Sequence, residues 1–79
     1  MTEKSGLYES VKRIMKREPR ALTDSALLEG MVYEKALGGE RAGRYSLRYC
    51  RDNFRRLCLP SPSEIREAAR EAVAEWDES

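Results

Sequence analysis

Residues 59–64 form a tight joint between two oppositely charged segments, and this joint limits the ways in which the chain can fold. Ser61 is placed to cap a helix, Pro62 suits the first helical position, and Glu64 completes a capping box. The segment before the joint is rich in arginine, whereas the segment after it is rich in glutamate. The pattern therefore predicts two consecutive helices with a short turn between them, as in a helix-turn-helix.

Apolar residues recur at helical spacing over most of the 79 residues, and this spacing predicts four helices. Pro19 ends the first pattern, and Gly38-Gly39 ends the second. We expect an all-α fold, in which residues 1–79 form one compact four-helix domain with a helix-turn-helix-like C-terminal pair. The predicted helices run from about Gly6 to Glu18, Asp24 to Leu37, Ser46 to Cys58 and Ser61 to Trp76, with residues 1–5 and 77–79 frayed.

The apolar faces of these helices predict the core. Gly30 interrupts the second apolar pattern at a cost of about 1 kcal/mol relative to alanine, and a close helix crossing is the simplest reason for it. Residues 45–49 also alternate like a strand, so a short strand there is the main alternative. The expected core residues are Leu27, Leu28, Met31, Val32, Leu47, Phe54 and Leu57, with the last helix docking through Ile65, Ala69, Val73 and Trp76.

The two cysteines, Cys50 and Cys58, both fall on the apolar face of the predicted third helix. They would lie roughly 12 Å apart along its axis, which is too far for a disulfide. We therefore expect buried free thiols and a cytoplasmic location. Residues 1–6 do not resemble a signal peptide, and no apolar run approaches the roughly 20 residues that a membrane span needs.

The composition gives little support for a catalytic or metal-binding function. Histidine, the commonest general base and metal ligand, is absent, and two cysteines eight residues apart do not make a zinc site. Residues 38–46 weakly resemble a phosphate-binding loop, but they have arginine where that motif has lysine and tyrosine where it has serine or threonine. Their backbone N–H groups could still bind an anion at the start of the next helix. We expect no catalytic residue, no metal site and no cofactor, and hence no enzyme.

Charge is divided unevenly along the chain. Residues 1–58 hold 13 Lys/Arg and 8 Asp/Glu, whereas residues 59–79 hold 2 and 6, and the formal net charge is only +1. Guanidinium groups bind phosphates with paired donors, so a row of arginines predicts a nucleic-acid contact surface. The arginine stripe, our candidate nucleic-acid-binding site, follows one side of the predicted third helix and consists of Arg44, Arg48, Arg51 and Arg55, with Arg41 nearby.

An acidic stripe on the last helix is an alternative binding partner for these arginines. The acidic stripe consists of Glu64, Glu67, Glu71 and Glu75, and Trp76 beside it is a further candidate interaction residue. It could pair with the arginine stripe within the fold or across a dimer. Exposed pairs of this kind contribute only about 0–1 kcal/mol each but can select a packing register. Glutamates facing phosphates are unfavourable, so the acidic stripe also argues against DNA reading by the last helix.

The run Leu59-Pro60-Ser61-Pro62-Ser63-Glu64-Ile65-Arg66 resembles the C-terminal part of small phage- and prophage-encoded helical proteins. Residues 20–28 are similar to the entry of the second helix in the same proteins. The resemblance implies a phage-derived helical protein, for which a helix-turn-helix role is commonly supposed. The chain departs from these proteins in the last helix, where Glu67, Ala69 and Glu71 occupy a stretch that is often arginine-rich.

We therefore expect a non-enzymatic helical binding module that acts through protein–protein contacts or homo-oligomerisation. A chain of this length buries only about 60% of its unfolded surface, so a homodimer or a protein partner would supplement a marginal core. The alternative is a nucleic-acid-binding protein that uses the arginine stripe. We expect no membrane partner.

Overall fold

The computed structural model describes residues 6–38 and 43–76, and within these ranges the chain is helical without strands. The all-α class predicted from sequence is confirmed. The strand alternative at residues 45–49 is wrong, because most of that segment lies in a helix that Ser46 caps. The elements are α1 (Gly6–Arg17), the 3₁₀-helix η1 (Pro19–Leu22), α2 (Ser25–Leu37), α3 (Leu47–Asp52) and α4 (Pro62–Ala74).

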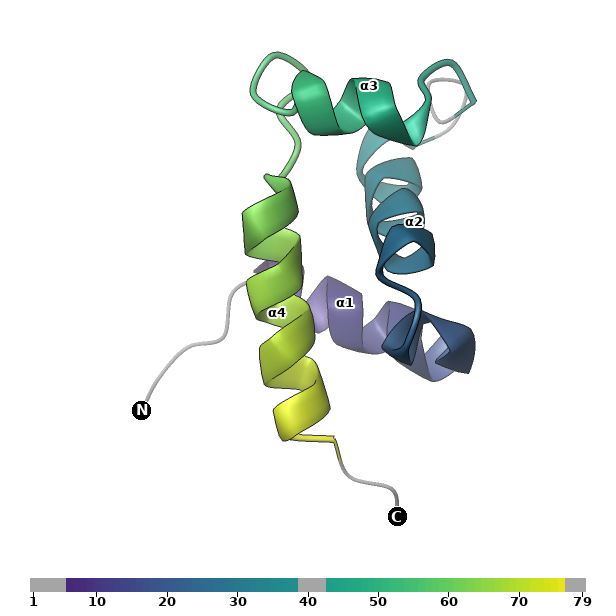
Figure 1. Ribbon diagram of the computed structural model, residues 1–79, viewed down its shortest axis with the longest axis vertical. Coiled ribbons are helices and arrows are strands. Elements are labelled where there is room, and N and C mark those ends of the chain that lie inside the picture. The colour runs from purple at the N-terminus through teal and green to yellow at the C-terminus, as the bar shows by residue number, and fades with distance from the viewer. Residues whose placement is uncertain (1–5, 39–42, 77–79) are drawn as a thin grey trace.

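Three longer helices and one short one make up the domain (Figure 1). α2 and α4 run along the long axis of the view, α3 lies across one end of both, and α1 crosses behind them. α1 packs most extensively against α4 and then against α2, whereas α3 packs mainly against α2. The core therefore forms where α1 crosses α2 and α4. None of the helices in the described ranges is long and apolar enough to cross a membrane.

Local capping interactions decide where α2 and α4 begin. The side chain of Asp24 accepts a hydrogen bond from the backbone N–H of Leu27 at 3.1 Å. Ser61 and Glu64 exchange side-chain-to-backbone hydrogen bonds of 3.1 Å in both directions, which completes the predicted capping box. Gly38 ends α2 with φ +67°, a conformation that favours glycine. These boundaries agree with the sequence prediction because each signal acts within a few residues.

The third helix is shorter than predicted. It ends at Asp52 rather than at Cys58. Asn53 leaves helical geometry there, with φ −125° and ψ 25°. Its side-chain amide donates to the carbonyl oxygen of Tyr49 at 3.0 Å, beside its own backbone N–H at 2.9 Å, and such local side-chain bonds favour asparagine at helix ends over helix interiors.

Residues 54–59 then close a separate turn. The backbone N–H of Leu59 donates to the carbonyl of Phe54 at 2.7 Å, and that of Cys58 donates to the carbonyl of Arg55 at 3.2 Å. This pair of bonds is the Schellman pattern, in which the penultimate residue takes a left-handed conformation. Cys58 takes that position with φ +58°, which a cysteine adopts less readily than glycine.

The two cysteines differ in environment. Cys50 is buried, as predicted, and its burial raises the pKa of its thiol. Cys58 is exposed, so the prediction that it is buried is wrong. The difference follows from the early end of α3, which removes Cys58 from the apolar face that the sequence pattern assigned to it. Both thiols are free.

The core is centred nearer to α1 than the sequence suggested. Leu28, Val32 and Ile65 are buried as predicted, whereas the other predicted core residues are half-buried, apart from Val73, which is 48% exposed. A Cβ atom added to Gly30 would meet no atom within 4 Å, so the predicted close helix crossing there is wrong. The buried apolar residues are Tyr8, Val11, Ile14, Met15, Ala21, Leu28, Val32, Tyr33, Cys50, Leu59, Ile65, Ala68 and Ala72.

Candidate functional site

The arginine stripe does not form one continuous row. Arg44 lies before α3 and Arg55 after it, so only Arg48 and Arg51 stand on the helix itself. Arg44, Arg48 and Arg55 are exposed. Arg41, the fifth member of the predicted site, lies outside the described residues. The interruption follows from the end of the helix at Asp52.

Arg51 is engaged within the fold. Its Nε donates to Oε1 of Glu29 at 2.7 Å, and its Nη2 donates to Oε2 at 3.2 Å, so the pair is bidentate. Glu29, on α2, is only 5% exposed, whereas 41% of the Arg51 side chain remains exposed. The hydrogen bonds to Glu29 raise the pKa of Arg51. Arg51 therefore neutralises a buried carboxylate and ties α3 to α2.

Tyr33 lies close to this pair in the same part of the core. It is 2% exposed, and its hydroxyl has no hydrogen-bond partner in the described part of the chain. Burial, with a smaller effect of the Glu29 charge, raises the pKa of Tyr33 to about 12. Tyr33 thus remains protonated well above neutral pH.

The acidic stripe does not cover the arginines. Glu64, Glu67, Glu71 and Glu75 are all exposed on α4, and Trp76 is half-buried against the core. In the described residues, no ion pair joins Glu64, Glu67 or Glu71 to an arginine of residues 44–56. This agrees with the packing, because α3 contacts mainly α2 and α4 contacts mainly α1.

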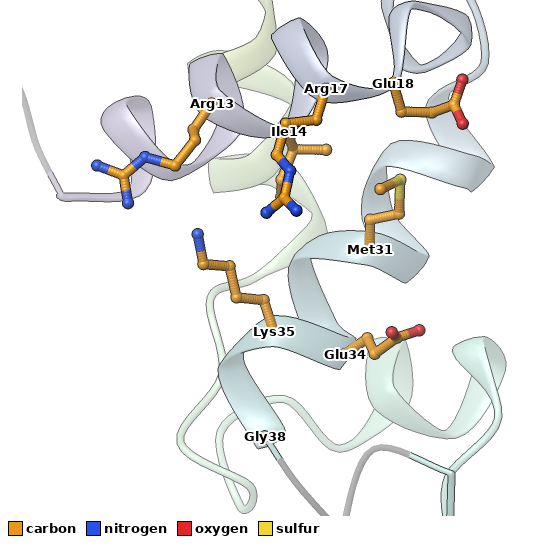
Figure 2. A pocket seen from close by; sticks show the side chains of 8 residues that line it. All are labelled: Arg13, Ile14, Arg17, Glu18, Met31, Glu34, Lys35 and Gly38. Atoms are coloured by element: carbon orange, nitrogen blue, oxygen red, sulfur yellow. The ribbon is translucent and has the colours of Figure 1, made fainter.

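A basic groove between α1 and α2 gathers three cationic side chains from the two helices. It has a volume of about 640 Å³ and lies beside the C-terminal halves of both helices. Figure 2 shows Arg17 extending from α1 and Lys35 extending from α2 toward each other, while Arg13 extends from α1 toward the outer side of the groove. All three side chains are exposed. We refer to Arg13, Arg17 and Lys35 as the basic groove cluster.

The nearby carboxylates do not neutralise the cluster. Glu18 is held by Arg20, whose Nε and Nη2 donate to its two oxygens at 3.0 Å each, and these bonds lower the pKa of Glu18. In Figure 2, Glu18 and Glu34 are directed away from the cationic ends. Within the described ranges, the cluster forms no ion pair with any carboxylate. The three cationic side chains therefore have no ion-pair partner in the described residues, although Glu34 also lines the groove.

This arrangement suits an anionic ligand. Guanidinium and ammonium groups bind phosphate or carboxylate oxygens through charge-assisted hydrogen bonds. Ile14 and Met31 line the groove between the charges and contribute apolar surface. A cation would be repelled from it, and the described residues hold no group of three or more metal-ligating side chains elsewhere.

Comparison with protein-family models, curated proteins and solved structures finds no match. The function is therefore inferred from the geometry of the groove itself.

Sequence reasoning missed this groove. Arg13 and Arg17 are one helical turn apart in a segment rich in basic residues, and that spacing alone places them on one side of α1. Lys35 is distant in sequence, and its position depends on how α2 crosses α1. The i, i+4 pair was the available signal, whereas the presence of three charges in one groove depends on packing.

Proposed function

We propose that the protein is a small non-enzymatic binding module that holds the phosphate backbone of a nucleic acid in the basic groove. The observation that carries the proposal is that one groove is lined by Arg13, Arg17 and Lys35, none of which has a carboxylate partner in the described residues. Phosphate contacts of this kind supply affinity without reading base sequence.

A chain of phosphates fits the groove better than one small anion. The cations come from two helices and line an open groove rather than an enclosed pocket. A nucleic-acid strand can place successive phosphates along such a surface.

This proposal keeps the nucleic-acid function expected as the alternative from sequence and moves its site from α3 to the groove. Arg51, the stripe residue that holds Glu29, is the reason for the change. The exposed arginines near α3 then serve as an internal comparison, because they carry the same charge in a different place.

Fluorescence anisotropy with short labelled single-stranded DNA, single-stranded RNA and duplex DNA tests the proposal. At about 50 mM salt, the triple variant Arg13→Gln, Arg17→Gln, Lys35→Gln should bind the best of these ligands at least about tenfold more weakly than the wild type. The matched control Arg44→Gln, Arg48→Gln, Arg55→Gln removes the same charge and should retain most of the affinity. Circular dichroism would establish that both variants fold.

Two outcomes would overturn the proposal. If the wild type binds none of the three nucleic acids at low salt, the groove does not serve this function. If the control variant loses affinity and the groove variant does not, the arginine stripe is the interface, as the sequence first suggested.

A further inference from the structure

A second groove lies between η1 and the C-terminal half of α4. Two adjoining hollows of about 520 Å³ and 600 Å³ share Leu22, Thr23 and Val73, so they form one continuous groove. Its bed is apolar and includes Met15, Leu28 and Ala69, and Trp76 lies at one end. We refer to this feature as the apolar groove.

The apolar groove exposes surface that a small protein would normally cover. Val73 is 48% exposed, and it is one of two large hydrophobic residues in the described ranges that are exposed. Leu22 and Trp76, which flank it, are only half-buried. Adjoining apolar side chains exposed in this way mark binding surfaces more often than isolated ones do.

The rim of the groove is positively charged. Arg66 and Arg70, one turn apart on α4, both line the groove and are exposed. Neither forms an ion pair with a carboxylate in the described residues. The glutamates of α4 do not line this groove. An occupant that complements the surface therefore needs apolar side chains with carboxylates beside them.

We propose that the apolar groove binds an amphipathic helix of a partner protein, with bulky apolar side chains on the bed and acidic side chains at Arg66 and Arg70. The groove runs beside α4 from Arg66 to Ala74, a length of roughly 13 Å, and helix-in-groove binding uses apolar anchors spaced along a helix face. This site is separate from the basic groove and does not depend on nucleic-acid binding.

A second copy of the chain is a poorer occupant. Its acidic helix α4 uses its apolar face in its own fold, where Ile65, Ala68 and Ala72 are buried. The exposed flank that carries Glu67 and Glu71 has no bulky apolar residue beside them. The α4 helix of a second copy would therefore supply the carboxylates but not the bulky apolar side chains that the groove needs.

Trp76 is the single tryptophan of the chain, so its fluorescence reports directly on the apolar groove. The probes are two synthetic helical peptides with the same leucine stripe, one with glutamates and one with lysines at the remaining positions. The acidic peptide should shift the Trp76 emission to shorter wavelengths in a saturable titration. The lysine peptide should bind at least about tenfold more weakly.

Variants locate the contact. Arg66→Glu with Arg70→Glu should weaken binding of the acidic peptide by about tenfold or more and should improve binding of the lysine peptide. Val73→Asp should weaken both, because it places a charge on the apolar bed. The matched control Arg44→Glu with Arg48→Glu should leave the affinity for the acidic peptide unchanged. Circular dichroism would establish that each variant folds.

Four results would overturn the inference. Equal binding of the two peptides would mean that charge does not select the partner. Loss of acidic-peptide binding in the Arg13→Gln, Arg17→Gln, Lys35→Gln variant would place the peptide in the basic groove. A dimer in sedimentation velocity that Val73→Asp dissociates would assign the groove to a second copy. Loss of nucleic-acid binding in the Arg66→Glu, Arg70→Glu variant would make it a nucleic-acid surface.

Discussion

Gly30 lies within α2, where glycine costs conformational entropy and gives no packing in return. Since a Cβ atom there would meet nothing within 4 Å, Gly30→Ala should raise the free energy of unfolding by about 0.5–1 kcal/mol. Urea denaturation would measure the change. Gly38→Ala is the matched control, and it should destabilise by roughly 1 kcal/mol because φ at Gly38 is +67°. A loss of stability in Gly30→Ala would indicate a close contact that the structure lacks.

The raised pKa of Tyr33 predicts that the stability of the fold changes at alkaline pH. Its pKa is raised to about 12 in the folded protein, above the ordinary value of 10.0, so the unfolded state loses this proton first. Stability is therefore retained below pH 10 and decreases as pH rises towards 12, by up to about 3 kcal/mol from this residue. Denaturant unfolding at neutral pH and at several values between about 10 and 12 would follow the change.

Tyr33→Phe is the control for that titration. It removes the ionisable group and a hydroxyl without a hydrogen-bond partner in the described residues, so at neutral pH it should be neutral or up to about 1 kcal/mol stabilising. Above pH 10 its stability should decrease less steeply than that of the wild type. Parallel pH profiles for the two proteins would mean that Tyr33 ionises as easily in the fold as outside it.

At the scale of elements, the bidentate pair between Glu29 and Arg51 joins α2 to α3. Arg51→Ala leaves the Glu29 carboxylate buried without its partner, which should lower the midpoint of thermal unfolding. Glu29→Met combined with Arg51→Ala removes both charges and should be less destabilising than Arg51→Ala alone. Differential scanning calorimetry of the two variants would test this order, and a double variant that is less stable than Arg51→Ala would contradict it.

Element boundaries were predictable from sequence where the signal is local. The glycine at position 38 and the exchange between Ser61 and Glu64 each act within three or four residues, and both are confirmed. The end of α3 was not predictable in this way. It depends on the side chain of Asn53 and on a left-handed turn at Cys58, a residue type that gives no turn signal.

At the scale of the whole molecule, the candidate site changed because packing is not local. The arginine stripe follows from helical spacing, but the sequence pattern does not reveal that Arg51 reaches Glu29, 22 residues away. The basic groove arises only when α1 and α2 cross and bring Lys35 to Arg13 and Arg17. The formal net charge of the whole chain, +1, gives no indication of this local group of positive charges.

The salt dependence of nucleic-acid binding measures how many phosphates the basic groove contacts. Each phosphate that the protein neutralises releases counterions, so the logarithm of the binding constant decreases linearly with the logarithm of salt concentration. If Arg13, Arg17 and Lys35 each contact a phosphate, replacing all three with glutamine should reduce the magnitude of that slope by about two to three. The Arg44→Gln, Arg48→Gln, Arg55→Gln control should keep the wild-type slope. An unchanged slope in the groove variant would show that the basic groove does not hold the phosphate backbone.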